Sequence, residues 1–198
     1  MSMTIHEAVR VIAAMSQDAL AVVTMGSMNA MKEVRPGPLN LSSVPMMGGA
    51  SSLGLGLALG APERQVFVLD GDGSLLMQLG SLVTIAKQAP PNLYHFVLDN
   101  GIWYYRGGLI PHPGNGIADF GALARAAGYK QTWSIENAID LRTELPSILS
   151  VAGPSLIRLT ISHDNIRPWS SSNPQDEIPD SQFTRMGEEA RTMKQALM

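Results

Sequence analysis

The chain has 198 residues, a length that suits one domain with a sizeable buried core. Hydrophobic residues make up 45% and charged residues 16% of it, the formal net charge is -3, and there is no cysteine. Without a basic surface we expect no nucleic-acid partner, and without cysteine there can be no disulfide or thiolate-held metal centre within the chain. No stretch is typical of a signal peptide or a membrane span, so we expect a cytoplasmic protein without a membrane partner.

The first quarter of the chain shows alternating helix and strand patterns. The apolar spacing in Thr4–Ala14 predicts a helix capped by its first residue. Residues 19–24 form a short apolar run typical of a buried strand, which we expect to open into a loop at residues 25–28. Residues 31–40 are rich in Pro and Gly and are predicted to be irregular, whereas small residues and leucines in 48–59 indicate a closely packed helix.

The clearest unit follows. Residues 66–69 are a continuous apolar run of the kind found in buried parallel strands, and residues 70–74 form a glycine-rich turn after it. A helical pattern over 75–86 precedes a second apolar strand at 93–98, which ends in the Asp-Asn-Gly sequence at 99–101. This order predicts a βαβ unit with a right-handed crossover.

The same alternation continues, with helices near 118–127 and 137–151 and a strand at 155–161. Strands that alternate with helices predict an α/β fold, a three-layer sandwich with a mostly parallel sheet. We expect residues 1–164 to form this domain and residues 165–198 to be a linker and C-terminal tail that ends in a possible helix.

Polar residues at the ends of two neighbouring strands predict a metal-bridged diphosphate site. Gly71 and Gly73 leave room for a diphosphate to approach the backbone N–H groups of the following helix. Asp72 between them would repel a diphosphate unless a cation such as Mg²⁺ lay between the two. Asn100, 28 positions later at the end of the next strand, can offer its amide oxygen to the same ion, and the backbone carbonyl of Ile102 is a further candidate ligand. Either turn alone is common, but the pair at adjacent strand ends is a strong signal.

The combination resembles the binding motif of thiamine-diphosphate (ThDP) enzymes, which begins with Gly-Asp-Gly and closes with an Asn pair. Here that pair is Asp99-Asn100, a departure that spares the metal-ligating position. The segment Val44–Gly101 is similar to ThDP-dependent decarboxylases of the phosphonopyruvate and sulfopyruvate type, and the likeness in pattern extends over roughly residues 4–162.

This resemblance implies a cofactor site and a reaction. Met47 would be the bulky side chain beneath the cofactor that enforces its bent shape, and Asp72, Asn100 and Ile102 would hold the Mg²⁺. The residues implied to contact ThDP are Gly26, Ser27, Met47, Gly48, Gly71, Asp72, Gly73, Ser74 and Asn100. The implied reaction is the non-oxidative decarboxylation of a 2-oxo acid, similar to sulfopyruvate or phosphonopyruvate, to an aldehyde.

One part of the expected active site has no place in this chain. ThDP enzymes use a Glu from a pyrimidine-binding domain to activate the cofactor, and 198 residues cannot hold both domains. We therefore expect a separate, α-type pyrimidine-binding subunit and a hetero-oligomer. A ThDP-dependent carboligase and a non-catalytic partner-binding module remain alternatives. His112, between two prolines, is a weak candidate for acid/base chemistry, and Arg106 and the aromatic run at 103–105 are candidates for contacts with a substrate or a partner.

Overall fold

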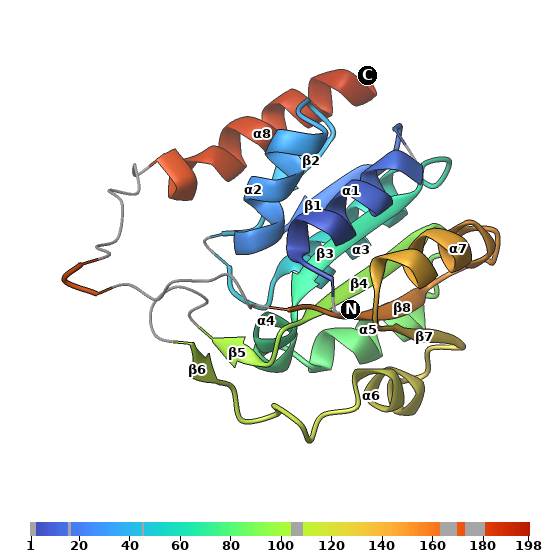
Figure 1. Cartoon of the computed structure of the whole chain (residues 1–198). Helices are drawn as coiled ribbons and strands as arrows, with labels where there is room; N and C mark the ends of the chain where they lie inside the picture. The colour runs from blue at the N-terminus through green and yellow to red at the C-terminus, as the bar shows by residue number, and fades with distance from the viewer. Residues whose placement is uncertain (1–2, 16, 45, 104–108, 163–169, 173–180) are drawn as a thin grey trace.

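A six-stranded parallel sheet forms the middle layer of the computed structural model (Figure 1). The structure describes residues 3–15, 17–44, 46–103, 109–162, 170–172 and 181–198. The strand order is β2-β1-β3-β4-β8-β7, and every neighbouring pair in this sheet is parallel. The strands of the sheet are β1 (Leu20–Val23), β2 (Asn40–Ser42), β3 (Val66–Gly71), β4 (Leu93–Asp99), β7 (Gln131–Ile135) and β8 (Ser155–Thr160).

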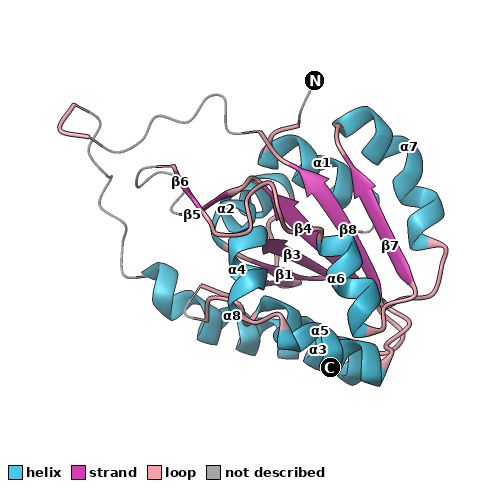
Figure 2. Cartoon of the chain, turned by 90° about the horizontal axis from the view of Figure 1, so that it is seen from below, coloured by secondary structure: helices cyan, strands magenta, loops and turns pink. Residues whose placement is uncertain are grey.

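Helices cover both faces of the sheet, which confirms the predicted α/β three-layer fold (Figure 2). One face packs against α1 (Ile5–Met15), α2 (Met25–Val34) and α7 (Ala138–Leu149). The other packs against α3 (Ala50–Gly60), α4 (Asp72–Met77), α5 (Gly80–Gln88) and α6 (Phe120–Ala127). Each interface is a separate apolar core, because successive strand residues point to opposite faces of the sheet. Val66 and Val68 of β3 belong to one core, and Phe67 and Leu69 to the other.

The predicted N-terminal helix and the βαβ unit are confirmed. Thr4 caps α1 in a reciprocal pair: its backbone N–H donates to Glu7 Oε2 (2.8 Å), and the Glu7 backbone N–H donates to Thr4 Oγ1 (3.2 Å). Strands β3 and β4 lie side by side and in register, with Asp70 opposite Val97 and Gly71 opposite Leu98. The carboxyl ends of these two strands therefore meet at one edge of the sheet.

Two predictions for residues 25–40 were wrong. No loop separates β1 from the next element, because α2 begins at Met25, two residues after the strand ends. The helix continues to Val34, so the residues before Asn40 are irregular only from 35 to 39. A reciprocal pair closes this turn: Arg35 Nη2 donates to Asn40 Oδ1 (2.8 Å), and Asn40 Nδ2 donates to the Arg35 carbonyl (2.7 Å). These contacts join specific side-chain and backbone atoms five positions apart, and composition alone does not show them.

The helix predicted over 75–86 is two helices. Helix α4 starts earlier, at Asp72, and stops at Met77, after which Gln78 has non-helical angles (φ -140°, ψ 48°). Helix α5 then runs from Gly80 to Gln88 and ends at Ala89 in a left-handed conformation (φ 49°). The apolar spacing continues across both helices, and for this reason the break at Gln78 does not appear in the pattern.

Helix α8 (Ser181–Leu197) packs against β2 at the edge of the sheet. Glu189 of α8 accepts hydrogen bonds from the Ser42 backbone N–H (2.6 Å) and the Ser42 hydroxyl (3.1 Å). Met193 of α8 is buried in the core on the α3 side. A carboxylate that accepts from an outer strand and an apolar anchor together cover this edge.

Between β4 and α6 in the chain, the short strands β5 (Ile102–Trp103) and β6 (Ile110–Pro111) form an antiparallel hairpin.

No helix among the described residues is long and apolar enough to cross a membrane.

Candidate ThDP-binding site

The candidate site lies at the carboxyl edge of the sheet. In a parallel sheet, ligands gather where the strand order reverses, and here the chain moves outward from β1 to β2 on one side and to β3 on the other. The first residues of α2 follow β1, and α4 follows β3 directly. The segments predicted to contact the cofactor, 26–27 and 71–74, therefore flank this switch point.

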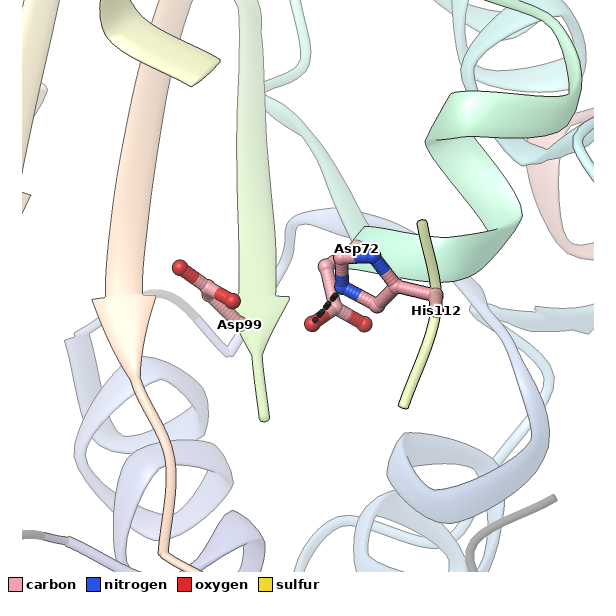
Figure 3. A group of neighbouring side chains, drawn as sticks. All are labelled: Asp72, Asp99 and His112. Atoms are coloured by element: carbon pink, nitrogen blue, oxygen red, sulfur yellow. Dashed lines mark hydrogen bonds and ion pairs between the residues drawn. The ribbon is translucent and has the colours of Figure 1, made fainter. Parts of the chain in front are cut away.

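Asp72 is the most highly coordinated side chain at this edge. It is buried, and its Oδ1 accepts from the Gly73 backbone N–H (2.7 Å). Its Oδ2 accepts from the Gly101 backbone N–H (2.6 Å) and lies 3.0 Å from Nε2 of His112 (Figure 3). Oδ2 thus accepts two of these hydrogen bonds and Oδ1 one, and Asp99 is a further hydrogen-bond neighbour of the same carboxyl group.

Asp99, the residue that departs from the expected Asn pair, is also part of the site. Ligand atoms of Asp72, Asp99 and His112 all lie within 4.8 Å of one another. Arg158 on the neighbouring strand β8 compensates part of this negative charge, because its Nε donates to Asp99 Oδ2 at 2.6 Å. Because two carboxylates face one guanidinium, this cluster of side chains has an excess of negative charge.

This environment raises the pKa of Asp72 to about 6 from its ordinary value of 3.8. Burial is the main cause, and the adjacent Asp99 raises the pKa further through its hydrogen bond and its charge. The N–H donors of Gly101 and Gly73 act in the opposite direction but do not outweigh burial. A cation beside a buried carboxylate whose pKa is raised in this way would stabilise its ionised form. Mg²⁺ prefers oxygen ligands of the kind that Asp72 and Asn100 carry.

Asn100 and Ile102 form the turn that follows β4. Asn100 Oδ1 accepts from the Ile102 backbone N–H (3.1 Å), a bond that fixes the amide oxygen in the turn next to Asp72's partner Gly101. Ile102 is buried and begins the hairpin. Asn100 and Ile102 thus flank Gly101, whose backbone N–H donates to the Asp72 carboxylate.

Gly26 and Ser27 belong to the first turn of α2. The Ser27 hydroxyl donates to the carbonyl of Leu69 in β3 (2.9 Å) and accepts from the Thr24 backbone N–H (3.0 Å). A Cβ at Gly26 would lie 2.8 Å from Ile5 Cδ1 of α1, so a larger residue would have to displace that side chain. In this structure, Ser27 ties the start of α2 to the end of β3.

Met47, Gly48 and Ser74 connect α3 to α4. The Gly48 backbone N–H donates to Ser74 Oγ (3.0 Å), and Gly48 has a left-handed backbone (φ 81°). A Cβ at Gly48 would lie 2.8 Å from Gln78 Cγ, so both the conformation and the space favour glycine. Met47 is 53% exposed at this edge, so its side chain is accessible to a bound molecule or a partner.

Trp103, which the sequence suggested only as a general pocket aromatic, lies directly over Gly73. A Cβ at Gly73 would fall 2.2 Å from the Trp103 indole ring, whereas a Cβ at Gly71, the residue before α4, would meet only Ser74 Cβ at 3.8 Å, an ordinary contact. The indole Nε1 is buried and has no hydrogen-bond partner among the described residues. It is therefore a free donor at the turn where a diphosphate is expected.

Sequence reasoning missed the roles of Asp99 and Arg158 in the site. The signal for Asp99 was its place at the same strand end as Asn100. Arg158 had no local signal, because its approach depends on the pairing of β4 with β8. The candidates Tyr104, Tyr105 and Arg106 lie outside the described residues.

Comparison with known proteins assigns the chain to one family. Residues 23–159 match the family model described as the thiamine pyrophosphate enzyme, C-terminal TPP binding domain. The chain therefore belongs to this family of ThDP-binding domains.

Two of the curated relatives are named decarboxylases. The chain is 39% identical over 153 residues to phosphonopyruvate decarboxylase of Streptomyces viridochromogenes, an alignment that covers 77% of this chain and 38% of the relative. It is 36% identical over 169 residues to sulfopyruvate decarboxylase subunit beta of Methanothermobacter thermautotrophicus, covering 85% and 84% of the two chains. The chain thus spans less than half of the first relative but most of the second.

A solved structure confirms the fold. The ThDP-dependent 4-hydroxybenzoylformate decarboxylase of Rhodococcus jostii RHA1 superposes with a TM-score of 0.65 at 22% identity. The match covers 81% of this chain and 33% of that one.

Proposed function

We propose that this chain is the diphosphate-binding part of a ThDP- and Mg²⁺-dependent enzyme that decarboxylates a 2-oxo acid without oxidation and releases an aldehyde. The observation that carries the proposal is the position of Asp72, buried at the end of β3 and in contact with the turn after β4. Residues 1–164 would form the cofactor domain, and residues 165–198 the linker and tail.

In this proposal Asp72, Asn100 and the backbone carbonyl of Ile102 hold the Mg²⁺. The oxygen character of these donors suits Mg²⁺, and the nearby carboxylate of Asp99 adds to the negative charge that a cation would offset. The raised pKa of Asp72 supports a ligand role too, because a cation would relieve the unfavourable burial of the carboxylate.

The remaining residues of the edge would shape the ThDP pocket. ThDP supplies carbanion stabilisation when carbon dioxide leaves a 2-oxo acid, and the protein supplies binding, orientation and a dry site. Exposed Met47 would contact the cofactor from the α3 side, and the small residues would let it approach the backbone. The small residues and serines proposed for these contacts are Gly26, Ser27, Gly48, Gly71, Gly73 and Ser74.

A second polypeptide would complete the active site. The sulfopyruvate decarboxylase relative, 84% of which is covered by this chain, is named as a beta subunit. The phosphonopyruvate decarboxylase relative is named without a subunit and is more than twice as long as the segment that this chain matches. We propose that a pyrimidine-binding α-type chain supplies the activating Glu and forms a cytoplasmic hetero-oligomer with this one. The names of the relatives support anionic 2-oxo acids, sulfopyruvate or phosphonopyruvate, as the substrate class.

Purification of the tagged chain from its native cells tests the proposal. Mass spectrometry of the complex should find ThDP and a stoichiometric second chain, and the complex should convert an anionic 2-oxo acid to an aldehyde in the presence of Mg²⁺. A hydroxyketone product would indicate carboligation instead. A lone chain that does not bind added ThDP and Mg²⁺ would contradict the proposal and favour a non-catalytic module.

A further inference from the structure

His112 is buried against the proposed metal ligand although it follows Asp72 by forty positions. The hairpin β5–β6 carries it to the site, and the His112 backbone N–H donates to the Gly101 carbonyl (3.3 Å). Its side chain is only 1% exposed and lies beside the Trp103 ring (centroids 6.5 Å apart). Pro111 and Pro113 on either side restrict the backbone, so the imidazole has little freedom to move.

The hydrogen bonds of His112 assign its proton to one nitrogen. Nδ1 lies 3.0 Å from the Gly114 backbone N–H and accepts from it, so Nδ1 cannot carry a proton in this arrangement. Nε2 must then be the protonated nitrogen of a neutral ring, and it donates to Asp72 Oδ2 at 3.0 Å. Both ring nitrogens are therefore engaged within the chain, and neither is directed at a substrate.

We propose that His112 is a positioning residue: its Nε2–H, together with the Gly101 N–H, occupies Oδ2 of Asp72 and orients Oδ1 toward the metal. This inference rests on the proposed function and deepens it. With three donors around the carboxylate, rotation of the Asp72 side chain would break at least one hydrogen bond. Outer contacts of this kind typically contribute 10- to 100-fold to metal affinity.

A different role, direct ligation of the metal by His112, is the alternative that the test must separate. The ligand atoms of His112 and of both carboxylates lie within 4.8 Å of one another. Ligation through Nε2 would move its proton to Nδ1, where it would oppose the Gly114 N–H. It would also place an imidazole on the ion, which favours Ni²⁺ or Co²⁺ over Mg²⁺. The two roles therefore differ in metal selectivity.

The test uses the full chain with any partner that copurifies, saturating ThDP, and Mn²⁺ as the probe, with free Mn²⁺ measured by electron paramagnetic resonance. His112→Ala should weaken Mn²⁺ binding about 10- to 100-fold. His112→Gln, which keeps a side-chain N–H donor, should recover a large part of that loss. His6→Ala, at a half-exposed position on α1, is the matched control and should bind Mn²⁺ as the wild type does.

The pattern of results separates the two levels of the argument. A wild type that binds neither ThDP nor Mn²⁺ would overturn the proposed function itself. A wild type that binds both, with unchanged Mn²⁺ affinity in a folded His112→Ala variant, would overturn the positioning role alone. Should His112→Ala unfold, His112→Gln decides the matter through the ratio of Ni²⁺ to Mn²⁺ affinities. Positioning predicts that this ratio stays at the wild-type value, and a selective loss of Ni²⁺ affinity would show ligation and overturn the proposal.

Discussion

The chain has two buried Asp–His pairs, Asp70–His95 and Asp72–His112, whose surroundings differ. The two aspartates are only two residues apart, where β3 passes into α4. Asp70 and His95, on neighbouring strands β3 and β4, are both 0% exposed and 3.4 Å apart, and among the described residues their side-chain polar atoms have no hydrogen-bond partner. Asp72 and His112 are also buried, yet the Asp72 carboxylate accepts two backbone N–H groups and the imidazole.

This difference shows which pair is suited to a ligand. The Asp70–His95 pair lies within the sheet on the face packed by α3, α4 and α5, among residues of the apolar core. The Asp72–His112 pair lies beyond the strand ends, where turns supply backbone N–H donors to the carboxylate. Burial alone therefore does not make a site; the donors and the open edge do. The four predictions below test this contrast, from the largest expected effect to the smallest.

His95→Leu should destabilise the fold by about 3–5 kcal/mol, because it leaves the Asp70 carboxyl group buried without its partner. Chemical denaturation in urea measures the loss. The double variant Asp70→Val/His95→Leu should lose less, since no polar group is then left buried and unpaired. His6→Ala on the surface should stay within about 0.5 kcal/mol of the wild type. A His95→Leu variant as stable as the control would contradict the interpretation.

The stability of the metal-free chain should fall as the pH rises, and Asp72 should be a main cause. The folded chain holds the Asp72 proton more tightly than the unfolded chain, because burial raises the pKa to about 6 from 3.8. The stabilisation is fully present below the unfolded pKa and is lost as the pH rises through 6, a change of about 3 kcal/mol at most. Asp72→Asn should remove this change.

The measurement is the free energy of unfolding of both chains, without metal, at pH 4.5 and pH 7.5. The wild type should lose more stability over this range than Asp72→Asn, so that the variant gains relative to the wild type at pH 7.5. An equal pH dependence of the two chains would show that Asp72 is not perturbed. Metal binding should depend on pH in the opposite direction. Mg²⁺ needs the ionised Asp72 carboxylate, so the affinity of the chain for Mg²⁺ should weaken below pH 6.

Much of this contrast could be predicted from the sequence, but the partners could not. Asp72 and Asn100 follow apolar strands in one βαβ unit, and local order was sufficient to place them together. Asp99, Arg158 and His112 reach the site through the pairing of β4 with β8 and through the hairpin β5–β6. Such long-range pairings depend on the whole sheet, and no local pattern encodes them. The start of α2 combines a local and a distant contact, since Ser27 bonds to Thr24 in the same turn and to Leu69, 42 positions away.

Gly73→Ala should disturb the surroundings of the Asp72–His112 pair and not those of the Asp70–His95 pair. The new Cβ would fall 2.2 Å from the Trp103 indole, so the ring must move, at a cost of about 1–3 kcal/mol. Trp103 fluorescence and urea denaturation report the movement and the loss. Gly80→Ala in α5 has open space around the new Cβ and is the matched control, expected to be neutral or stabilising. Equal stability of the two variants would contradict the packing of Trp103 on Gly73.

Glu189 in α8 offers a third carboxylate, bound by N–H and hydroxyl donors but without a neighbouring acid or imidazole in the described contacts. Glu189→Ala should remove both bonds to Ser42 and cost about 1–2 kcal/mol. Because the hydrogen bonds of Glu189 are to β2, two places from β3 in the strand order, and not to the residues proposed to hold ThDP, binding of ThDP should not change. Glu188→Ala, exposed on the same helix, is the control. If Glu189→Ala weakened ThDP binding, the β2 edge and the site after β3 would not be independent.

The most direct test of the central claim is calorimetric titration of ThDP into the wild-type complex and into Asp72→Asn, each with and without Mg²⁺. Glu63→Gln, at an exposed carboxylate, serves as the matched control. We predict that the wild type and Glu63→Gln bind ThDP only with Mg²⁺, and that Asp72→Asn loses at least about 100-fold in affinity. Asp72→Asn that binds ThDP as tightly as the wild type, with the same need for Mg²⁺, would show that Asp72 does not hold the metal.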